Sequence, residues 1–160
     1  MTSDQPSSAT LRVGGRDDGL ERWLDDELTA FNARATGAGE PAPLTVRATD
    51  GTGRLIGGLT AWVWGRQCSI DMLWVREDQR HAGWGRRLVR AAEEESVRRG
   101  CTSITVSSYT FQAPGFYRKL GFREVGRIDG VPGGHADVSF HKVITPEPKP
   151  DDPPRARPVG

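Results

Sequence analysis

The 160-residue sequence predicts a single α/β (α+β) domain in which a mixed central β-sheet is flanked by helices. Two observations lead to this prediction. Strand-like and helix-like segments alternate along residues 11–144, and short glycine-containing turns join the first three strand-like segments into an antiparallel meander. The apolar content is sufficient for one core, and no internal repeat is evident.

The first half of this domain begins with a helix. Residues 19–35 carry apolar side chains at helical spacing, which indicates one amphipathic helix. Three strands follow, and the sequence Asp-Gly-Thr-Gly at 50–53 supplies a tight turn between the first two. We expect these strands at residues 44–48, 55–64 and 68–75.

The second half alternates in the same way. Residues 85–99 form the next expected helix, and Gly100 stands where a C-terminal cap belongs. A strand, a short helix ended by Gly121 and two final strands complete the domain, at residues 102–106, 113–120, 122–128 and 136–144.

Composition limits the partners and the setting. The net charge of +1 gives no argument for a nucleic-acid partner, and no apolar run is long enough to span a membrane. Cys68 and Cys101 lack the spacing of a zinc site, so we expect buried thiols and no metal. The N-terminus does not resemble a signal peptide, which favours a cytoplasmic protein, and the excess of arginine over lysine is typical of GC-rich bacterial genomes. Residues 1–10 and the proline-rich residues 145–160 are expected to be disordered tails.

The most informative segment is the turn at residues 80–85, Arg-His-Ala-Gly-Trp-Gly, which joins the strand ending at Val75 to a helix. Backbone N–H groups at a helix start lack intrahelical partners and lie at the positive end of the helix dipole, so such a turn binds anions. Gly83 and Gly85 lack a Cβ and would let a phosphate approach the main chain. The turn has neither the Gly-Lys-Ser/Thr of a Walker loop nor a dinucleotide fingerprint. We therefore expect a phosphorylated cofactor of another kind.

Two longer motifs resemble those of a known family. Residues 73–88, Leu-Trp-Val-Arg-Glu-Asp-Gln-Arg-His-Ala-Gly-Trp-Gly-Arg-Arg-Leu, resemble the acyl-CoA-binding motif of the GNAT superfamily of N-acetyltransferases. Residues 113–122, Ala-Pro-Gly-Phe-Tyr-Arg-Lys-Leu-Gly-Phe, resemble its second signature, and the resemblance covers residues 43–144. The chain departs from the family where many members have proline, glycine and asparagine, at Glu77, His81 and Thr110 respectively.

The resemblance implies a cleft for acetyl-CoA, the acetyl donor, between two splayed strands. Main-chain groups of Leu73, Trp74 and Val75 would pair with the pantetheine arm, and one N–H would polarise the thioester carbonyl. Trp84 is expected to pack the helix start rather than to stack on adenine. The pyrophosphate would be held by the turn and the first helical residues, namely Arg80, His81, Ala82, Gly83, Trp84, Gly85 and Arg86.

Two residues are expected to carry the chemistry. Tyr117 matches the family position that protonates the departing thiolate, and a phenol with a pKa of about 10 holds that proton at neutral pH. Asp71 matches a frequently acidic position and would act as the base, directly or through water. Strand alternation would place it on the same face as Leu73 and Val75. The alternative is that Asp71 faces solvent or pairs with an arginine.

The acceptor side is less well defined. Trp62 and Trp64 alternate on one strand and share a face, where they would either wall a pocket for an amine or pack against the N-terminal helix. His135 follows two glycines in a loop and is a candidate for substrate binding or for the base, whereas His141 is expected to be an ordinary strand residue.

The sequence therefore predicts an enzyme that transfers an acetyl group from acetyl-CoA to a primary amine by direct attack, without a covalent enzyme intermediate. The alternative is a catalytically inactive acyl-CoA-binding sensor. The acceptor is a small-molecule amine or a peptide amine, and pairing of two copies through the C-terminal strands, common in the family, is left open.

Overall fold

The computed structural model describes residues 9–144. The tail expected at 145–160, and residues 1–8 of the tail expected at 1–10, lie outside the described residues. The chain divides into two compact units with a boundary between Glu40 and Pro41, and each unit is described by itself. Among the residues described, no helix combines the length and the apolar character needed to cross a membrane.

The first unit consists of α1 (Asp18–Thr36), which confirms the expected amphipathic helix. Asp17 caps its start, because the carboxylate accepts hydrogen bonds from the N–H groups of Gly19 at 3.1 Å and Leu20 at 2.9 Å. Gly37 ends the helix in the left-handed conformation with φ of 65°.

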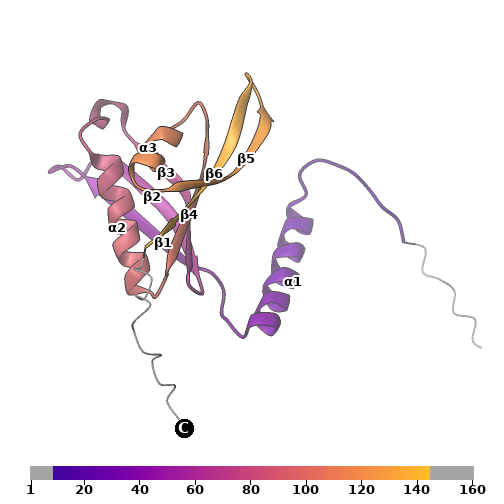
Figure 1. Cartoon of the computed structure of the whole chain (residues 1–160). Coiled ribbons are helices and arrows are strands. Elements are labelled where there is room, and N and C mark those ends of the chain that lie inside the picture. The colour runs from indigo at the N-terminus through magenta and orange to yellow at the C-terminus, as the bar shows by residue number, and fades with distance from the viewer. Residues whose placement is uncertain (1–8, 145–160) are drawn as a thin grey trace, which may run out of the picture. The chain divides into compact units, whose positions relative to one another are not determined.

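The second unit is built on a six-stranded sheet with the order β1-β2-β3-β4-β6-β5, shown in Figure 1. Neighbouring strands are antiparallel except β3 and β4, which run parallel. The predicted mixed sheet is therefore confirmed. The strands are β1 (Ala42–Thr49), β2 (Leu55–Trp64), β3 (Gln67–Val75), β4 (Ser103–Tyr109), β5 (Arg123–Val131) and β6 (His135–Val143), and the helices are η1 (Glu77–Gln79), α2 (Trp84–Arg98) and α3 (Pro114–Lys119).

One hydrophobic core joins α2, α3 and one face of this sheet. Leu88 and Val89 of α2 and Tyr117 of α3 belong to it, and alternate strand residues such as Val106 and Phe140 point into it. The remaining strand positions form what we call the second face of the sheet, which is richer in polar side chains. Its members include Thr60, Trp62, Ser69, Thr105, Ser107, Tyr109, Asp137, Ser139 and His141.

β3 departs from regular pairing on both sides at its midpoint. Its pairing with β2 passes from Thr60–Met72 to Ala61–Ile70, so Asp71 is an extra residue in a β-bulge. On the other side, β3 pairs with β4 only as far as Ile70–Val106, although both strands continue. The two strands therefore separate after this pair, which is the splay that the family resemblance implies.

Candidate active site

A cleft of about 510 Å³ opens where β3 and β4 separate. Its walls carry four hydroxyl side chains and a single charged group, the carboxylate of Asp71. The hydroxyls of Ser107 and Ser139 lie 3.3 Å apart and tie β4 to β6 at this point. Such walls suit a polar ligand that bears a positive charge. The lining residues are Ser69, Ile70, Asp71, Thr105, Val106, Ser107, Val125, Ser139 and Phe140.

Asp71 owes its place in the cleft to the bulge. Before the bulge Ile70 points into the core, and after it Leu73 and Val75 pack against the core. Asp71 does not share their environment, because it is exposed and lines the cleft. The expected common face of these three residues therefore does not persist across the bulge, since the extra residue shifts the alternation by one.

The segment Leu73–Val75 lies at the free edge of β3, as the resemblance requires. Its residues pair with β2 on one side, whereas the ladder to β4 has already ended. β2 approaches this segment closely at Gly57, where an added Cβ would lie 2.6 Å from the carbonyl oxygen of Trp74. Gly57 therefore fixes the position of the strand edge that faces the splay.

The turn after β3 leaves the start of α2 open. Gly83 is its N-cap in the left-handed conformation with φ of 81°, no side chain caps the helix, and no acidic residue stands in its first turn. His81 also adopts a positive φ, 65°, which is unusual for a residue with a side chain. Ala82, within this turn, and Arg86, just after it, are exposed. An uncapped helix start among arginines suits a pyrophosphate.

The two glycines of the turn serve different purposes. A Cβ on Gly83 would meet no atom within 4 Å, so its requirement is the left-handed backbone. A Cβ on Gly85 would lie 3.1 Å from the ring of Phe116, so this glycine lets α2 pack against α3. Packing of α2 against α3 therefore accounts for the glycine at position 85, where the sequence predicted the close approach of a phosphate.

Aromatic and guanidinium groups pair on either side of the turn. The guanidinium of Arg80 lies 4.4 Å from the ring centre of Trp74, and that of Arg87 lies 4.0 Å from the ring centre of Trp84. Trp84 also packs against the core, as expected for a residue that secures the helix start.

Tyr117 is placed by α3 in an aromatic cluster. Tyr117 is only 6% exposed. The centre of its ring lies 5.1 Å from that of Phe116, 5.6 Å from that of Phe122 and 5.8 Å from that of Phe140. Burial raises the pKa of the phenol to about 12. Tyr117 does not line the cleft itself, but it contacts Phe140, which does.

The hydroxyl of Tyr117 makes no hydrogen bond with the residues described. Within residues 9–144, Thr60 Oγ1 is the one fully buried side-chain polar atom without a partner, so the tip of Tyr117 is not sealed in the core. The phenol is therefore protonated and available to an incoming group.

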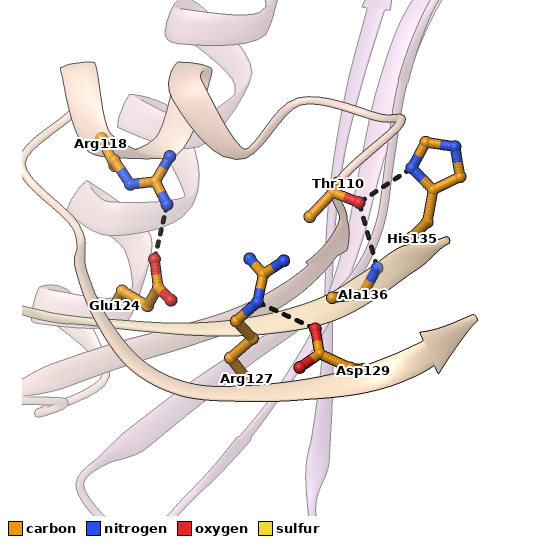
Figure 2. Close-up of polar contacts among 7 residues, drawn as sticks. All are labelled: Thr110, Arg118, Glu124, Arg127, Asp129, His135 and Ala136. Carbon is orange, nitrogen blue, oxygen red and sulfur yellow. Dashed lines mark hydrogen bonds and ion pairs between the residues drawn. The ribbon is translucent and has the colours of Figure 1, made fainter. Parts of the chain in front are cut away.

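The acceptor-side candidates lie at different distances from the cleft. Trp62 lies opposite Ser69, a cleft residue, and Trp64 lies opposite Gln67, further from it. His135 begins β6, where its Nδ1 lies 3.0 Å from Thr110 Oγ1, as Figure 2 shows. The sheet thus brings Trp62 close to the cleft that Asp71 lines, whereas His135 lies further along the sheet.

Sequence reasoning missed several residues of this region. Gly57 stands in a Gly-Gly pair inside a strand, which is a known signal of close backbone approach and would have identified it. The Ser107–Ser139 pair joins two strands that are distant in sequence, and no local pattern marks it.

Comparisons with known proteins agree on the family. Residues 10–122 match the Acetyltransferase (GNAT) family. Blasticidin-S acetyltransferase of Streptomyces morookaense is 38% identical over 130 residues, which cover 78% of this chain and 93% of that protein. An acetyltransferase of Agrobacterium fabrum is 25% identical over 122 residues, covering 76% of this chain and 89% of that protein.

Solved structures share the fold. An acetyltransferase from Bacillus cereus has a TM-score of 0.74 at 27% identity, covering 83% of this chain and 97% of its own. An aminoglycoside 6′-N-acetyltransferase complexed with coenzyme A has a TM-score of 0.61 at 22% identity, covering 84% and 98%. The chain therefore belongs to the GNAT family, and it is an acyltransferase that transfers an acetyl group from acetyl-CoA to an amine.

Proposed function

We propose that the acceptor is a small, polar, positively charged molecule and that its amine is acetylated in the cleft between β3 and β4. The observation that carries this proposal is the single carboxylate of Asp71 among hydroxyl-bearing walls. The relative from Streptomyces morookaense is a blasticidin-S acetyltransferase, so blasticidin S is the first acceptor to test.

The donor supplies an activated thioester, and main-chain groups of this chain hold it. The free edge at Leu73, Trp74 and Val75 would hydrogen-bond the pantetheine amides, and a fixed N–H there would stabilise charge on the thioester oxygen. The N–H groups of the turn and helix start would bind the pyrophosphate, which Arg80 and Arg86 complement in charge. Residues 73–75 and 80–86 are thus the segments that we propose bind acetyl-CoA.

Asp71 is proposed as the base. An alkyl amine is mostly protonated at neutral pH, so it must lose a proton before its nitrogen can attack. The carboxylate of Asp71 lines the cleft and would first attract the ammonium and then accept its proton, directly or through one water.

Tyr117 is proposed as the acid. With a pKa of about 12, its phenol is fully protonated at neutral pH and can hydrogen-bond the sulfur as the carbon–sulfur bond breaks. An ordinary thiol has a pKa near 8.5, so a phenol this weakly acidic stabilises the leaving sulfur chiefly as a hydrogen-bond donor. It then regains any donated proton readily.

Trp62 is proposed to wall the acceptor site beside Ser69, with Trp64 and His135 as more distant contacts. We further propose a bacterial, cytoplasmic setting, where acetyl-CoA is made and where the free Cys68 and Cys101 would remain reduced. β5 forms an edge of the sheet with exposed side chains, which supports pairing of two copies there; light scattering of the purified protein tests this.

The deciding experiment follows thiol release from acetyl-CoA with blasticidin S, aminoglycosides, simple amines and N-terminal peptides. We expect turnover with a polar small molecule and none with peptides. Tyr117→Phe should lower kcat about 100-fold while leaving the Kd for acetyl-CoA within about twofold, since the hydroxyl acts only as sulfur leaves. Asp71→Asn should lower kcat by a similar factor, most strongly below the amine's pKa.

A matched control is Tyr109→Phe, which removes a hydroxyl from β4 without touching the proposed chemistry. Equal activity of Tyr117→Phe and wild type would remove Tyr117 from the mechanism. Preferred acetylation of peptides would contradict the small-molecule acceptor.

A further inference from the structure

His135 is held in one orientation at the start of β6. Thr110 Oγ1 lies 3.0 Å from its Nδ1, and the same oxygen accepts a hydrogen bond from the N–H of Ala136 at 3.1 Å, as Figure 2 shows. The ring of Phe111 packs edge-on against the imidazole at a centroid distance of 5.1 Å. The N–H of Thr110 also donates to the carbonyl of Ala136 at 2.9 Å, which fixes the two segments together.

This arrangement selects one tautomer of the imidazole. Thr110 Oγ1 already accepts from a backbone N–H, and its own proton has no acceptor among residues 9–144 other than His135 Nδ1. We assign the hydroxyl proton to this contact, so that Oγ1 donates to Nδ1 and the neutral ring carries its proton on Nε2. Nε2 has no partner within the described part of the chain and presents an N–H donor.

The backbone of the preceding turn supports this orientation. Gly133 has φ of 79°, and a Cβ there would lie 3.1 Å from His135 Cδ2. The turn thus comes close to one edge of the ring, which only glycine allows without displacing it.

His135 lies on the second face of the sheet, in line with the cleft. On β6 it precedes Asp137 and Ser139 at alternate positions, and Ser139 lines the cleft opposite Ser107. Four residues along a strand span about 13 Å. The backbone of His135 therefore lies about 13 Å along β6 from Ser139, which lines the cleft.

We propose that His135 determines acceptor specificity by donating a hydrogen bond from Nε2 to an oxygen or an unprotonated nitrogen of the acceptor. The acceptor is then an elongated molecule that extends from the cleft along β6 toward His135, over roughly 13 Å. In this scheme His135 acts as a hydrogen-bond donor and not as the general base, because the one lone pair of its neutral ring, on Nδ1, accepts from Thr110 Oγ1 and Nε2 faces the acceptor as N–H. The proposal rests on the proposed function, since it concerns the acceptor of the same cleft.

The first test is independent of turnover. Nitrogen-15 NMR of the histidine side chains in the free protein should show His135 protonated on Nε2 and unprotonated on Nδ1. Thr110→Val should abolish this preference, and Thr110→Ser, which keeps the hydroxyl, should retain it. A ring protonated on Nδ1 in the wild type would overturn the proposal.

The second test is kinetic. For the best small-molecule acceptor, His135→Phe should raise the acceptor KM about tenfold, as expected for one lost hydrogen bond. The kcat and the KM for acetyl-CoA should stay within about twofold, and His135→Gln, which keeps an N–H donor, should recover part of the loss. His141→Gln, on the same strand and face, is the matched control and should change none of these constants.

The outcomes separate the two proposals. A fall in kcat of His135→Phe with an unchanged acceptor KM would make His135 a base and overturn the inference, as would unchanged constants. An acceptor analogue lacking the distant oxygen or nitrogen should have the same KM with wild type and His135→Phe, and a difference would contradict the assigned contact. No turnover by the wild type with any acceptor would overturn the proposed function, while the NMR result still decides the hydrogen-bond scheme.

Discussion

In the turn before α2, His81 adopts a backbone conformation that its side chain does not explain. His81 has φ of 65°, and its side chain is exposed. A residue with a Cβ in this conformation bears a steric strain of roughly 1–2 kcal/mol that glycine avoids. Many family members have glycine at this position, and the chain here keeps a left-handed backbone at His81 all the same. We therefore expect the departure from glycine to affect stability and not the path of the chain.

Replacing this residue by glycine should stabilise the protein. We expect His81→Gly to increase the free energy of unfolding by about 0.5–1 kcal/mol, because relief of the strained φ outweighs the entropy lost by glycine. Urea denaturation measures this. Ala82→Gly is the matched control at a negative φ and should cost about 0.5–1 kcal/mol, so a loss in both variants would show that His81 is not strained.

At the level of elements, β2 and β3 are set by a close backbone contact. Gly57 lies opposite Val75, and Gly58 lies opposite Trp74. The two glycines are adjacent but differ in surroundings, because a Cβ on Gly57 would lie 2.6 Å from a backbone oxygen, whereas one on Gly58 would lie 3.3 Å from its nearest atom. The first contact cannot be relieved without moving a strand.

Gly57→Ala should therefore push β2 away from the segment of β3 that we propose holds the pantetheine arm. We expect a loss of about 2–3 kcal/mol in the free energy of unfolding, together with weaker binding of acetyl-CoA. Gly58→Ala should cost less than about 1 kcal/mol and leave binding unchanged. Urea denaturation and calorimetric titration with acetyl-CoA measure both, and equal effects of the two changes would disprove the role of the close contact.

For the whole molecule, the buried phenol of Tyr117 couples stability to alkaline pH. In the folded state the pKa of the phenol is about 12, whereas an unfolded tyrosine has its ordinary pKa of 10.0. Below pH 10 both states are protonated and stability is unaffected. Between pH 10 and 12 only the unfolded state loses its proton, so stability falls as pH rises.

Two pKa units correspond to a loss of about 2–3 kcal/mol across this range. Tyr117→Phe should lack this part of the decline. Urea denaturation of both proteins at pH 8 and at pH 11.5 measures the difference, with pH 8 as the reference. Parallel declines in the two proteins would place the alkaline sensitivity elsewhere.

The sequence predicted the elements well because each is governed by local pattern. Residues 19–35 carry the helical spacing of α1, and residues 55–64 the composition of β2. β4 extends to Tyr109, three residues beyond its expected end, because Ser107 and its neighbours pair with β6, a partner that local pattern does not reveal. For the same reason the sequence does not reveal the Thr110–His135 contact, whereas Tyr117 and Asp71 could be predicted as site residues because they lie inside or beside a motif.

The bulge at Asp71 has a consequence for how this protein tolerates insertions and deletions. Without that residue, Leu73 and Val75 would follow Ile70 in unbroken alternation, and every inward side chain of β3 would still face inward. A chain that lacks this one residue would keep its core pattern and form a more regular sheet. In that sheet the pairing of β3 with β4 could continue beyond Ile70 and Val106. It would lack the bulge that places Asp71 in the cleft, where we propose that the acceptor binds. We therefore expect deletion of this single residue to leave a folded protein without acetyltransferase activity.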